Sequence, residues 1–278
     1  IKAIGYDMDY TLIDYKMVLL EERVYHYSKE YLLSKGFPVS GLEFTHDLVV
    51  RGLIVDTLHG HVLKVDRFGY VQRAMHGTRV LTSAEIVETY GNGPPIDLRD
   101  SRWRFLNTLF SVSEGCLYAQ LVDRLDSGQL ITDSSPPFDQ ERCSTYEQLY
   151  RAVSKALFKA HVQSQMKEEI MKDPLRYVKT DPAYTRTLLD QRAAGKKLAL
   201  ITNSDWVYTN TMMHATYDPF LPEGMRWIDL FDVVVVSACK PEFFSTSRRP
   251  VYEIATAEVR RVGPLPLAIP PFAIRSAR

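Results

Sequence analysis

The sequence predicts an α/β fold built on a parallel sheet, with a large insertion between its first and second strands. Apolar runs at 1–6, 197–202 and 230–237 are typical of buried strands. Helical periodicity separates the later runs, and strand, helix, strand, helix, strand is the order of a parallel sheet covered by helices. The segment from Tyr15 to about Pro174 interrupts this order, so we expect it to form a separate α+β domain.

The first half of the chain begins with a strand that ends at an acidic cluster. Met17–Leu33 follows with helical periodicity and ends before a Gly-Phe-Pro sequence. Leu48–Val80 contains short β-branched and aromatic runs separated by His59-Gly60 and Phe68-Gly69, a pattern that predicts a small β-meander.

The second half is predicted to contain a surface loop, three helices and an irregular tail. The loop is Ser127–Thr145, the helices are Tyr146–Met171, Leu188–Ala194 closed by Gly195, and one from Tyr208 onward, and the tail follows Pro250.

Composition and charge limit the classes of function. The 278 residues hold 34 basic and 34 acidic side chains, so the formal net charge is zero. Neither nucleic acid nor an anionic membrane is expected as a partner. Cys116, Cys143 and Cys239 have no metal-binding spacing, which favours free thiols. No apolar stretch approaches the ~18 residues that span a bilayer and no signal peptide is visible, so a cytoplasmic location is expected.

The first predicted strand ends in the motif Asp7-Met8-Asp9-Tyr10-Thr11. Ligands of α/β sheets bind at the carboxyl ends of strands, where two such carboxylates can face one pocket. One of the two carboxylates can attack phosphorus to form an aspartyl-phosphate, while the other protonates the leaving oxygen and later deprotonates water. Taken alone, an Asp-x-Asp pair is better explained as an ordinary acidic turn.

The second buried strand ends in Thr202, Asn203 and Ser204. A hydroxyl together with the amides of a helix N-terminus can hold a phosphate. Taken alone, capping of the next helix by Ser204 or Asp205 explains this segment better. The two roles can coexist.

The third buried strand leads to Lys240-Pro241. Beside Asp7 and a phosphoryl group, the Lys240 ammonium would neutralise negative charge in the ground and transition states. A solvated loop lysine is the alternative. Three strands that each end in a group needed for phosphoryl transfer make the combination more telling than any one motif.

These motifs resemble those of the haloacid dehalogenase (HAD) superfamily, and the fuller strings are similar to its cytosolic purine 5′-nucleotidase branch. The strings are Gly5-Tyr-Asp-Met-Asp-Tyr-Thr-Leu12, Ile201-Thr-Asn-Ser-Asp205, Lys240-Pro-Glu-Phe-Phe244 and Phe105-Leu-Asn-Thr-Leu-Phe110. The resemblance runs from Ile1 to about Glu253. It implies a Rossmann-like HAD core at 1–12 and 175–278 and an inserted α+β cap at 13–174.

The resemblance implies catalytic roles at the strand ends. Asp7 is expected to be the nucleophile and a Mg²⁺ ligand, and Asp9 the acid/base that also binds Mg²⁺ through its backbone carbonyl. Thr202 and Lys240 are expected to hold the phosphoryl group, with Asn203 beside them in the substrate site.

The resemblance also implies a nucleotide site in the cap. Asn107, Thr108 and Phe110 match a segment whose aromatic ring stacks on the purine, and His161 and Lys167 match a pair that contacts the base and a phosphate or ribose. The alternatives are Phe110 as cap core, His161 as an exposed helix residue and Lys167 as one charge on a solvated face.

Two positions near His161 depart from the family pattern. The family places an arginine and an aspartate one to two turns before this histidine, where the present chain has Ser154 and Phe158. These departures concern purine recognition, so they leave the identity of the substrate open. Relatives in this branch are often oligomers, which leaves a homo-oligomer open.

The fourth HAD motif, an acidic pair that completes the Mg²⁺ shell, has no counterpart that the sequence identifies. No aspartate follows Asp232, and none of Glu242, Glu253 and Glu258 follows a strand-like run. With Asp7 as the main carboxylate, Mg²⁺ would be weakly held. The sheet would be incomplete at its C-terminal side, which predicts low stability.

Three functions follow as hypotheses. The first is a Mg²⁺-dependent 5′-nucleotidase that hydrolyses a purine nucleoside monophosphate through an aspartyl-phosphate. The second is a catalytically impaired nucleotide-binding relative or fragment, and the third is a phosphatase of another small phosphoester.

Overall fold

A computed structural model of the chain describes residues 1–91, 95–107, 110–130, 143–162, 165–245, 252–254 and 261–264; the side chains of 160–162, 165, 252–254 and 261–264 lie outside this description. The chain divides into two compact units, one of Ile1–Lys16 with Lys167–Arg278 and one of Met17–Met166. Their interpretation as a core at 1–12 with 175–278 and a cap at 13–174 stays a prediction.

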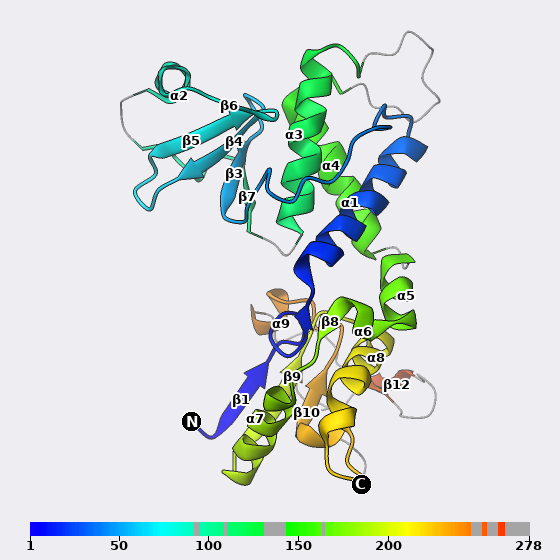
Figure 1. Cartoon of the computed structure of the whole chain (residues 1–278). Helices are drawn as coiled ribbons and strands as arrows, with labels where there is room; N and C mark the ends of the chain where they lie inside the picture. The colour runs from blue at the N-terminus through cyan, green and yellow to red at the C-terminus, as the bar shows by residue number, and fades with distance from the viewer. Residues whose placement is uncertain are drawn as a thin grey trace. The chain divides into compact units, whose positions relative to one another are not determined.

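The first unit contains a three-stranded sheet in the order β1-β9-β10 (Figure 1). The strands are β1 (Ala3–Tyr6), β9 (Lys197–Ile201) and β10 (Val233–Val235). Both outer strands run parallel to β9. The predicted parallel sheet is confirmed for these three strands, and their carboxyl ends meet at one edge.

The third strand is shorter than the predicted run 230–237. Leu230 ends a 3₁₀ helix, η2 (Trp227–Leu230), and the strand stops at Val235. Beyond it, Ser237 and Cys239 adopt left-handed backbone conformations, with φ of 49° and 58°. Non-glycine residues seldom take such values, so the chain turns sharply here instead of extending the strand.

The first unit also contains a second strand pair and several helices. They are the antiparallel pair β2 (Asp14–Tyr15) and β8 (Val178–Lys179), the helices α5 (Gln165–Lys172), α6 (Pro174–Tyr177), α7 (Pro182–Ala193), α8 (Trp206–Tyr217) and α9 (Glu242–Ser245), and the 3₁₀ helix η1 (Asp218–Phe220). Helix α7 begins earlier than the predicted residue 188, because Asp181 caps the amide of Ala183 and Pro182 fits the first helical position.

The second unit contains the predicted β-meander, extended by one strand. Its antiparallel sheet has the order β6-β5-β4-β3-β7. The strands are β3 (Leu53–Asp56), β4 (His61–Val65), β5 (Val71–His76), β6 (Arg79–Val80) and β7 (Trp103–Leu106). Its apolar core is shared with α2 (Ser83–Tyr90) and consists of Ile54, Leu63, Ala74, Leu81 and Trp103, with Ile86 and Tyr90 packed against it.

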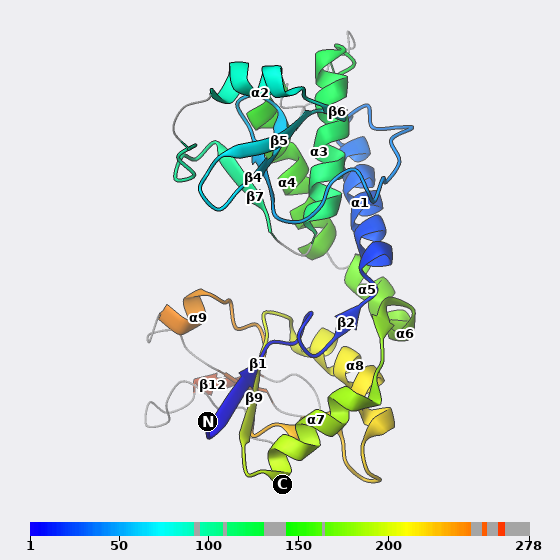
Figure 2. The same ribbon diagram turned by 60° about the vertical axis from the view of Figure 1, so that its left-hand side comes forward.

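Three helices lie side by side in the second unit in both views (Figure 2). They are α1 (Met17–Ser34), α3 (Ser111–Asp126) and α4 (Tyr146–Val162). Helix α1 confirms the helix predicted from Met17. The predicted helix Tyr146–Met171 corresponds to α4 and to α5, which ends one residue later at Lys172. Gln163 and Ser164 between them lie outside the described residues, as do 131–142 of the predicted loop.

The segment after Pro250 is not wholly irregular, contrary to the prediction. β11 (Tyr252–Ile254) pairs antiparallel with β12 (Arg261–Pro264). Glu253 therefore lies within a strand and Glu258 comes after one in the sequence, although Glu258 itself is outside the described residues. No helix in the described part of the chain is long and apolar enough to cross a membrane.

Candidate active site

Asp7 and Lys240 meet at the carboxyl edge of the parallel sheet. The Lys240 Nζ lies 2.6 Å from the Asp7 Oδ2. The same Nζ donates to the carbonyl of Ile201, the last residue of β9, at 2.9 Å. The Lys240 side chain is 19% exposed and the Asp7 side chain 44%, so the carboxylate faces solvent while the cation lies partly beneath it.

The loop after β1 is wound tightly around one carbonyl. The amides of Leu12 and Ile13 donate to the Met8 carbonyl at 2.9 and 3.0 Å. Tyr10 has a φ of 60°, which is unusual for a bulky side chain and is tolerated where the surrounding structure fixes the backbone. This winding sends Asp7 outward and turns Asp9 back toward the protein.

Asp9 is held by two hydroxyl groups. The Tyr15 hydroxyl donates to its Oδ1 at 2.6 Å and the Ser204 Oγ to its Oδ2 at 2.9 Å. Burial raises the pKa of Asp9 above its ordinary value; the hydrogen bonds from Tyr15 and Ser204 oppose this shift, and the nearby Asp7 charge adds to it. Asp9 therefore holds a proton more readily than an ordinary aspartate.

The segment after β9 links the other two motifs. The amide of Ser204 donates to the Thr202 Oγ1 at 3.1 Å, and the Asn203 side chain accepts from the Lys240 amide at 2.6 Å. Thr202 is buried and Asn203 is exposed. Asp205 caps α8 through the amide of Tyr208, at 2.9 Å, so capping falls to Asp205, and Ser204 is used for Asp9.

Lys167 also belongs to this site. Its Nζ lies 3.3 Å from the Asp205 Oδ2 and 5.1 Å from the centre of the Tyr208 ring. Its charge acts on Asp9, where it lowers the pKa. The strand-end residues and Lys167 are thus brought together within one unit of the chain.

Comparison of the sequence with known protein families identifies the family of this chain. The sequence model of the 5′ nucleotidase family matches residues 1–263. The chain belongs to the 5′ nucleotidase family.

Three curated relatives of this 5′ nucleotidase family member are each 29% identical to it. A 5′-nucleotidase domain-containing protein of Dictyostelium discoideum aligns with 89% of the chain and 41% of its own length. The human 5′-nucleotidase domain-containing proteins 1 and 2 align with 94% and 90% of the chain, and with 58% and 47% of their own lengths. The chain thus spans about half the length of the curated relatives it matches.

The nucleotide-site residues predicted for the cap region lie in the second unit of this family member, apart from Lys167. Asn107 is exposed directly after β7, and Phe110 is half-buried directly before α3. Thr108 and the side chain of His161 lie outside the described residues. At the two departures from the pattern, Ser154 is hydrogen-bonded to Glu114, and Phe158 is 62% exposed.

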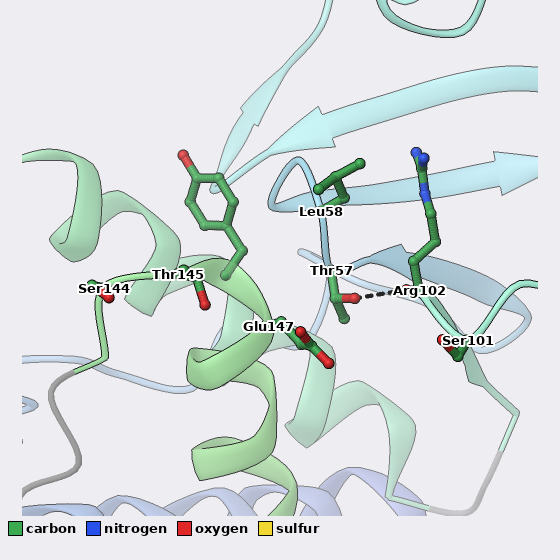
Figure 3. Close-up of a pocket in the computed structure, with 8 residues that line it drawn as sticks. Thr57, Leu58, Ser101, Arg102, Ser144, Thr145 and Glu147 are labelled. Atoms are coloured by element: carbon green, nitrogen blue, oxygen red, sulfur yellow. Dashed lines mark hydrogen bonds between the residues drawn. The ribbon is translucent and has the colours of Figure 1, made fainter.

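A pocket of about 400 Å³ lies elsewhere in the second unit (Figure 3). It is lined by Thr57, Leu58, Ser101, Arg102, Ser144, Thr145, Tyr146 and Glu147. The Thr57 hydroxyl donates to the Arg102 carbonyl at 2.8 Å, and the Arg102 side chain is paired with Asp56. None of the predicted site residues is among the described residues that line this pocket.

The donors around Asp7 fit part of a Mg²⁺ site. Mg²⁺ is commonly held by one or two carboxylates together with waters and substrate phosphate oxygens. Asp7 is accessible, while both carboxylate oxygens of Asp9 accept from hydroxyls, which leaves the Asp9 carbonyl as its other oxygen donor. The described residues contain no group of three His, Cys, Asp or Glu that could hold a metal ion.

Two site residues were missed by sequence reasoning. The sequence does not single out Tyr15, and it predicts Ser204 only as a helix cap. The sequence carries a weak signal for Ser204, which follows Thr202 at a strand end, and none for Tyr15, whose strand β2 is only two residues long.

Proposed function

We propose that the first unit is an HAD-type, Rossmann-like core and that this family member hydrolyses a nucleoside 5′-monophosphate with Mg²⁺. The observation that carries the proposal is the pairing of Asp7 with Lys240 at 2.6 Å, beside a second carboxyl group on Asp9. The match to the 5′ nucleotidase family supports the substrate class.

The partners of the two aspartates favour different roles. Asp7 accepts from the Met8 amide at 2.7 Å and from the Lys240 ammonium at 2.6 Å, and both of these groups can only donate. The hydroxyl partners of Asp9 can donate or accept. They are compatible with both protonated and ionised Asp9, as an acid/base requires.

In the first step, an oxygen of Asp7 attacks phosphorus and forms an aspartyl-phosphate bond. The bond from phosphorus to the 5′-oxygen breaks, and Asp9 gives its proton to that oxygen to release the nucleoside. In the second step, Asp9 takes a proton from water as the water oxygen attacks phosphorus. The bond from phosphorus to Asp7 breaks, which restores the carboxylate and releases phosphate.

The other residues hold charge and position. The Lys240 ammonium stabilises negative charge on the phosphoryl oxygens, and Thr202 and Asn203 contribute hydrogen-bonding groups at the same edge. A Mg²⁺ ion held by Asp7 and the Asp9 carbonyl would add positive charge at the phosphoryl group. We assign the nucleoside to Asn107, Thr108, Phe110, His161 and Lys167 by resemblance, with a purine as the preferred base.

The test is release of phosphate from nucleoside monophosphates by Asp7→Asn. Loss of the nucleophile is expected to lower turnover by about 10³-fold or more, without loss of stability. Asp14→Asn is the matched control, because Asp14 is also partly exposed and lies on neighbouring β2, 3.8 Å from Lys179. Retained turnover in Asp7→Asn would exclude the aspartyl-phosphate route.

A nucleotide-binding protein without turnover is the second candidate. It is motivated by the fourth, acidic motif that the sequence does not identify, and the described residues contain no group of three His, Cys, Asp or Glu that could hold a metal ion. Calorimetry in excess Mg²⁺ separates the two: binding of a nucleoside monophosphate with no phosphate release supports this candidate, and release supports the first.

A phosphatase of another small phosphoester is the third candidate. Ser154 is hydrogen-bonded to Glu114, at a position where the family resemblance implies a base contact. A panel that includes sugar phosphates decides between the substrates, since faster turnover of a sugar phosphate would favour this candidate.

A further inference from the structure

Both carboxylate oxygens of Asp9 are occupied by hydroxyl groups from separate parts of the chain. Tyr15 reaches Oδ1 from β2, and Ser204 reaches Oδ2 from the segment after β9, at 2.6 and 2.9 Å. A carboxyl group with one directed partner on each oxygen is held in a single orientation.

Each hydroxyl group is itself held in place. Tyr15 is 2% exposed, and its backbone in β2 pairs with Val178 in β8. The centre of its ring lies 4.9 Å from that of the Tyr10 ring. The Ser204 amide donates to the Thr202 Oγ1 and its carbonyl accepts from the Ser237 amide at 2.8 Å. Neither donor can turn away without breaking other contacts.

The direction of the hydrogen bonds follows from the number of protons. The Tyr15 hydroxyl has one proton, which it gives to ionised Asp9. Its oxygen lies 3.0 Å from the Tyr208 hydroxyl, so Tyr208 donates to Tyr15. When Asp9 is protonated, the same hydroxyl oxygens can accept, so the contact survives in both states of the acid/base.

We propose that Tyr15 and Ser204 are positioning residues that fix the Asp9 carboxyl group for proton transfer to the leaving oxygen and from water. The inference rests on the proposed function, because it assumes the acid/base role of Asp9. Neither hydroxyl is assigned a contact with substrate.

The proposal predicts an effect on turnover and little effect on substrate binding. General acid–base catalysis contributes about 10²- to 10⁴-fold, and misplacement of the group forfeits part of this. Tyr15→Phe and Ser204→Ala are each expected to lower kcat by about 10- to 100-fold, with KM within about twofold. Ser204→Thr restores the hydroxyl and is expected to recover most of the lost kcat.

Tyr217→Phe is the control for loss of a buried tyrosine hydroxyl. Tyr217 is 1% exposed, lies in the same unit and donates to the Leu12 carbonyl at 2.8 Å. Its substitution is expected to lower Tm about as much as Tyr15→Phe does and to leave kcat unchanged. A kcat for Tyr15→Phe equal to that of Tyr217→Phe would overturn the proposal.

A crystal structure of the Tyr15→Phe chain separates this inference from the proposed function. If the wild-type chain releases no phosphate, the proposed function fails and the positioning claim is decided by geometry. Asp9 in more than one rotamer supports positioning by Tyr15, and an unchanged single rotamer contradicts it. The role of Ser204 is tested if the wild type is active. A Ser204→Thr chain that has the wild-type Tm but the low kcat of Ser204→Ala would count against this role.

Discussion

The Lys240 Nζ lies 2.6 Å from the Asp7 Oδ2, although β1 and β10, the strands before these residues, are not neighbours in the sheet. Strand β9 lies between them. The Lys240 side chain extends across the carboxyl end of β9, where its Nζ donates to the carbonyl of Ile201. The left-handed turns at Ser237 and Cys239 bring the lysine back to this point. The ion pair therefore depends on the sheet order as well as on the two residues.

Replacing Lys240 is expected to impair phosphoryl transfer. Lys240→Met removes the cation beside Asp7 and should lower kcat/KM by about 10²-fold or more, as loss of a preorganised charge partner does in other active sites. The measurement is Mg²⁺-dependent phosphate release. Lys197→Met is the control, because Lys197 pairs with Asp232 and is 73% exposed. Equal losses in both variants would contradict the role of Lys240.

Asp9→Asn is expected to flatten the dependence of stability on pH. Burial raises the pKa of Asp9 above the ordinary 3.8, so the folded state binds this proton more tightly than the unfolded chain. Asp9 therefore stabilises the folded state at pH values below its ordinary pKa, and this stabilisation is lost as the pH rises through the pKa of the folded state. Thermal unfolding in EDTA from about pH 4 to about pH 7 should show Asp9→Asn gaining Tm relative to wild type. A Tm of Asp9→Asn that falls relative to wild type as the pH rises would contradict the raised pKa.

Lys167→Met is expected to act on substrate binding. The Lys167 ammonium lies against Asp205 and the Tyr208 ring, and the family resemblance implies that it contacts a phosphate or ribose group. We expect KM for a nucleoside monophosphate to rise about tenfold, and Lys167→Arg to retain most binding. Lys172→Met on the same helix is the control, since Lys172 is exposed. A change in kcat alone would argue against a binding role.

Gly115→Ala is expected to destabilise the second unit despite the higher helix propensity of alanine. A Cβ at Gly115 would lie 2.6 Å from the Val49 Cγ1 and 2.9 Å from the Leu106 Cδ1. Val49 is stiff and buried, so the expected cost is about 1–3 kcal/mol by denaturant unfolding. Adding Val49→Ala should recover part of the loss, and a stabilised Gly115→Ala would show that the helix shifts freely.

The sequence predicts the strand-end motifs because the information is local. Apolar runs identify the strands, and the parallel order brings their ends together, so Asp7, Thr202 and Lys240 are found without a structure. The partners of Asp9 need three-dimensional information. Tyr15 reaches it only because Tyr10 takes a left-handed conformation and β2 pairs with β8, and neither leaves a periodic signal.

The short strands escape prediction for a related reason. Proline-rich sequence after Pro250 has no period of two, so the pairing of Tyr252 with Pro264 could not be foreseen. The helix α7 start was missed because its first turn depends on capping by Asp181 more than on apolar periodicity.

The central claim is tested most directly by phosphate release from a panel of nucleoside monophosphates, with and without Mg²⁺, by the 278-residue chain and its Asp7→Asn variant. The account predicts Mg²⁺-dependent release by the wild type that is lost in Asp7→Asn. Folded wild-type chain that binds a nucleotide and releases no phosphate, or an Asp7→Asn variant that turns over at the wild-type rate, would contradict it.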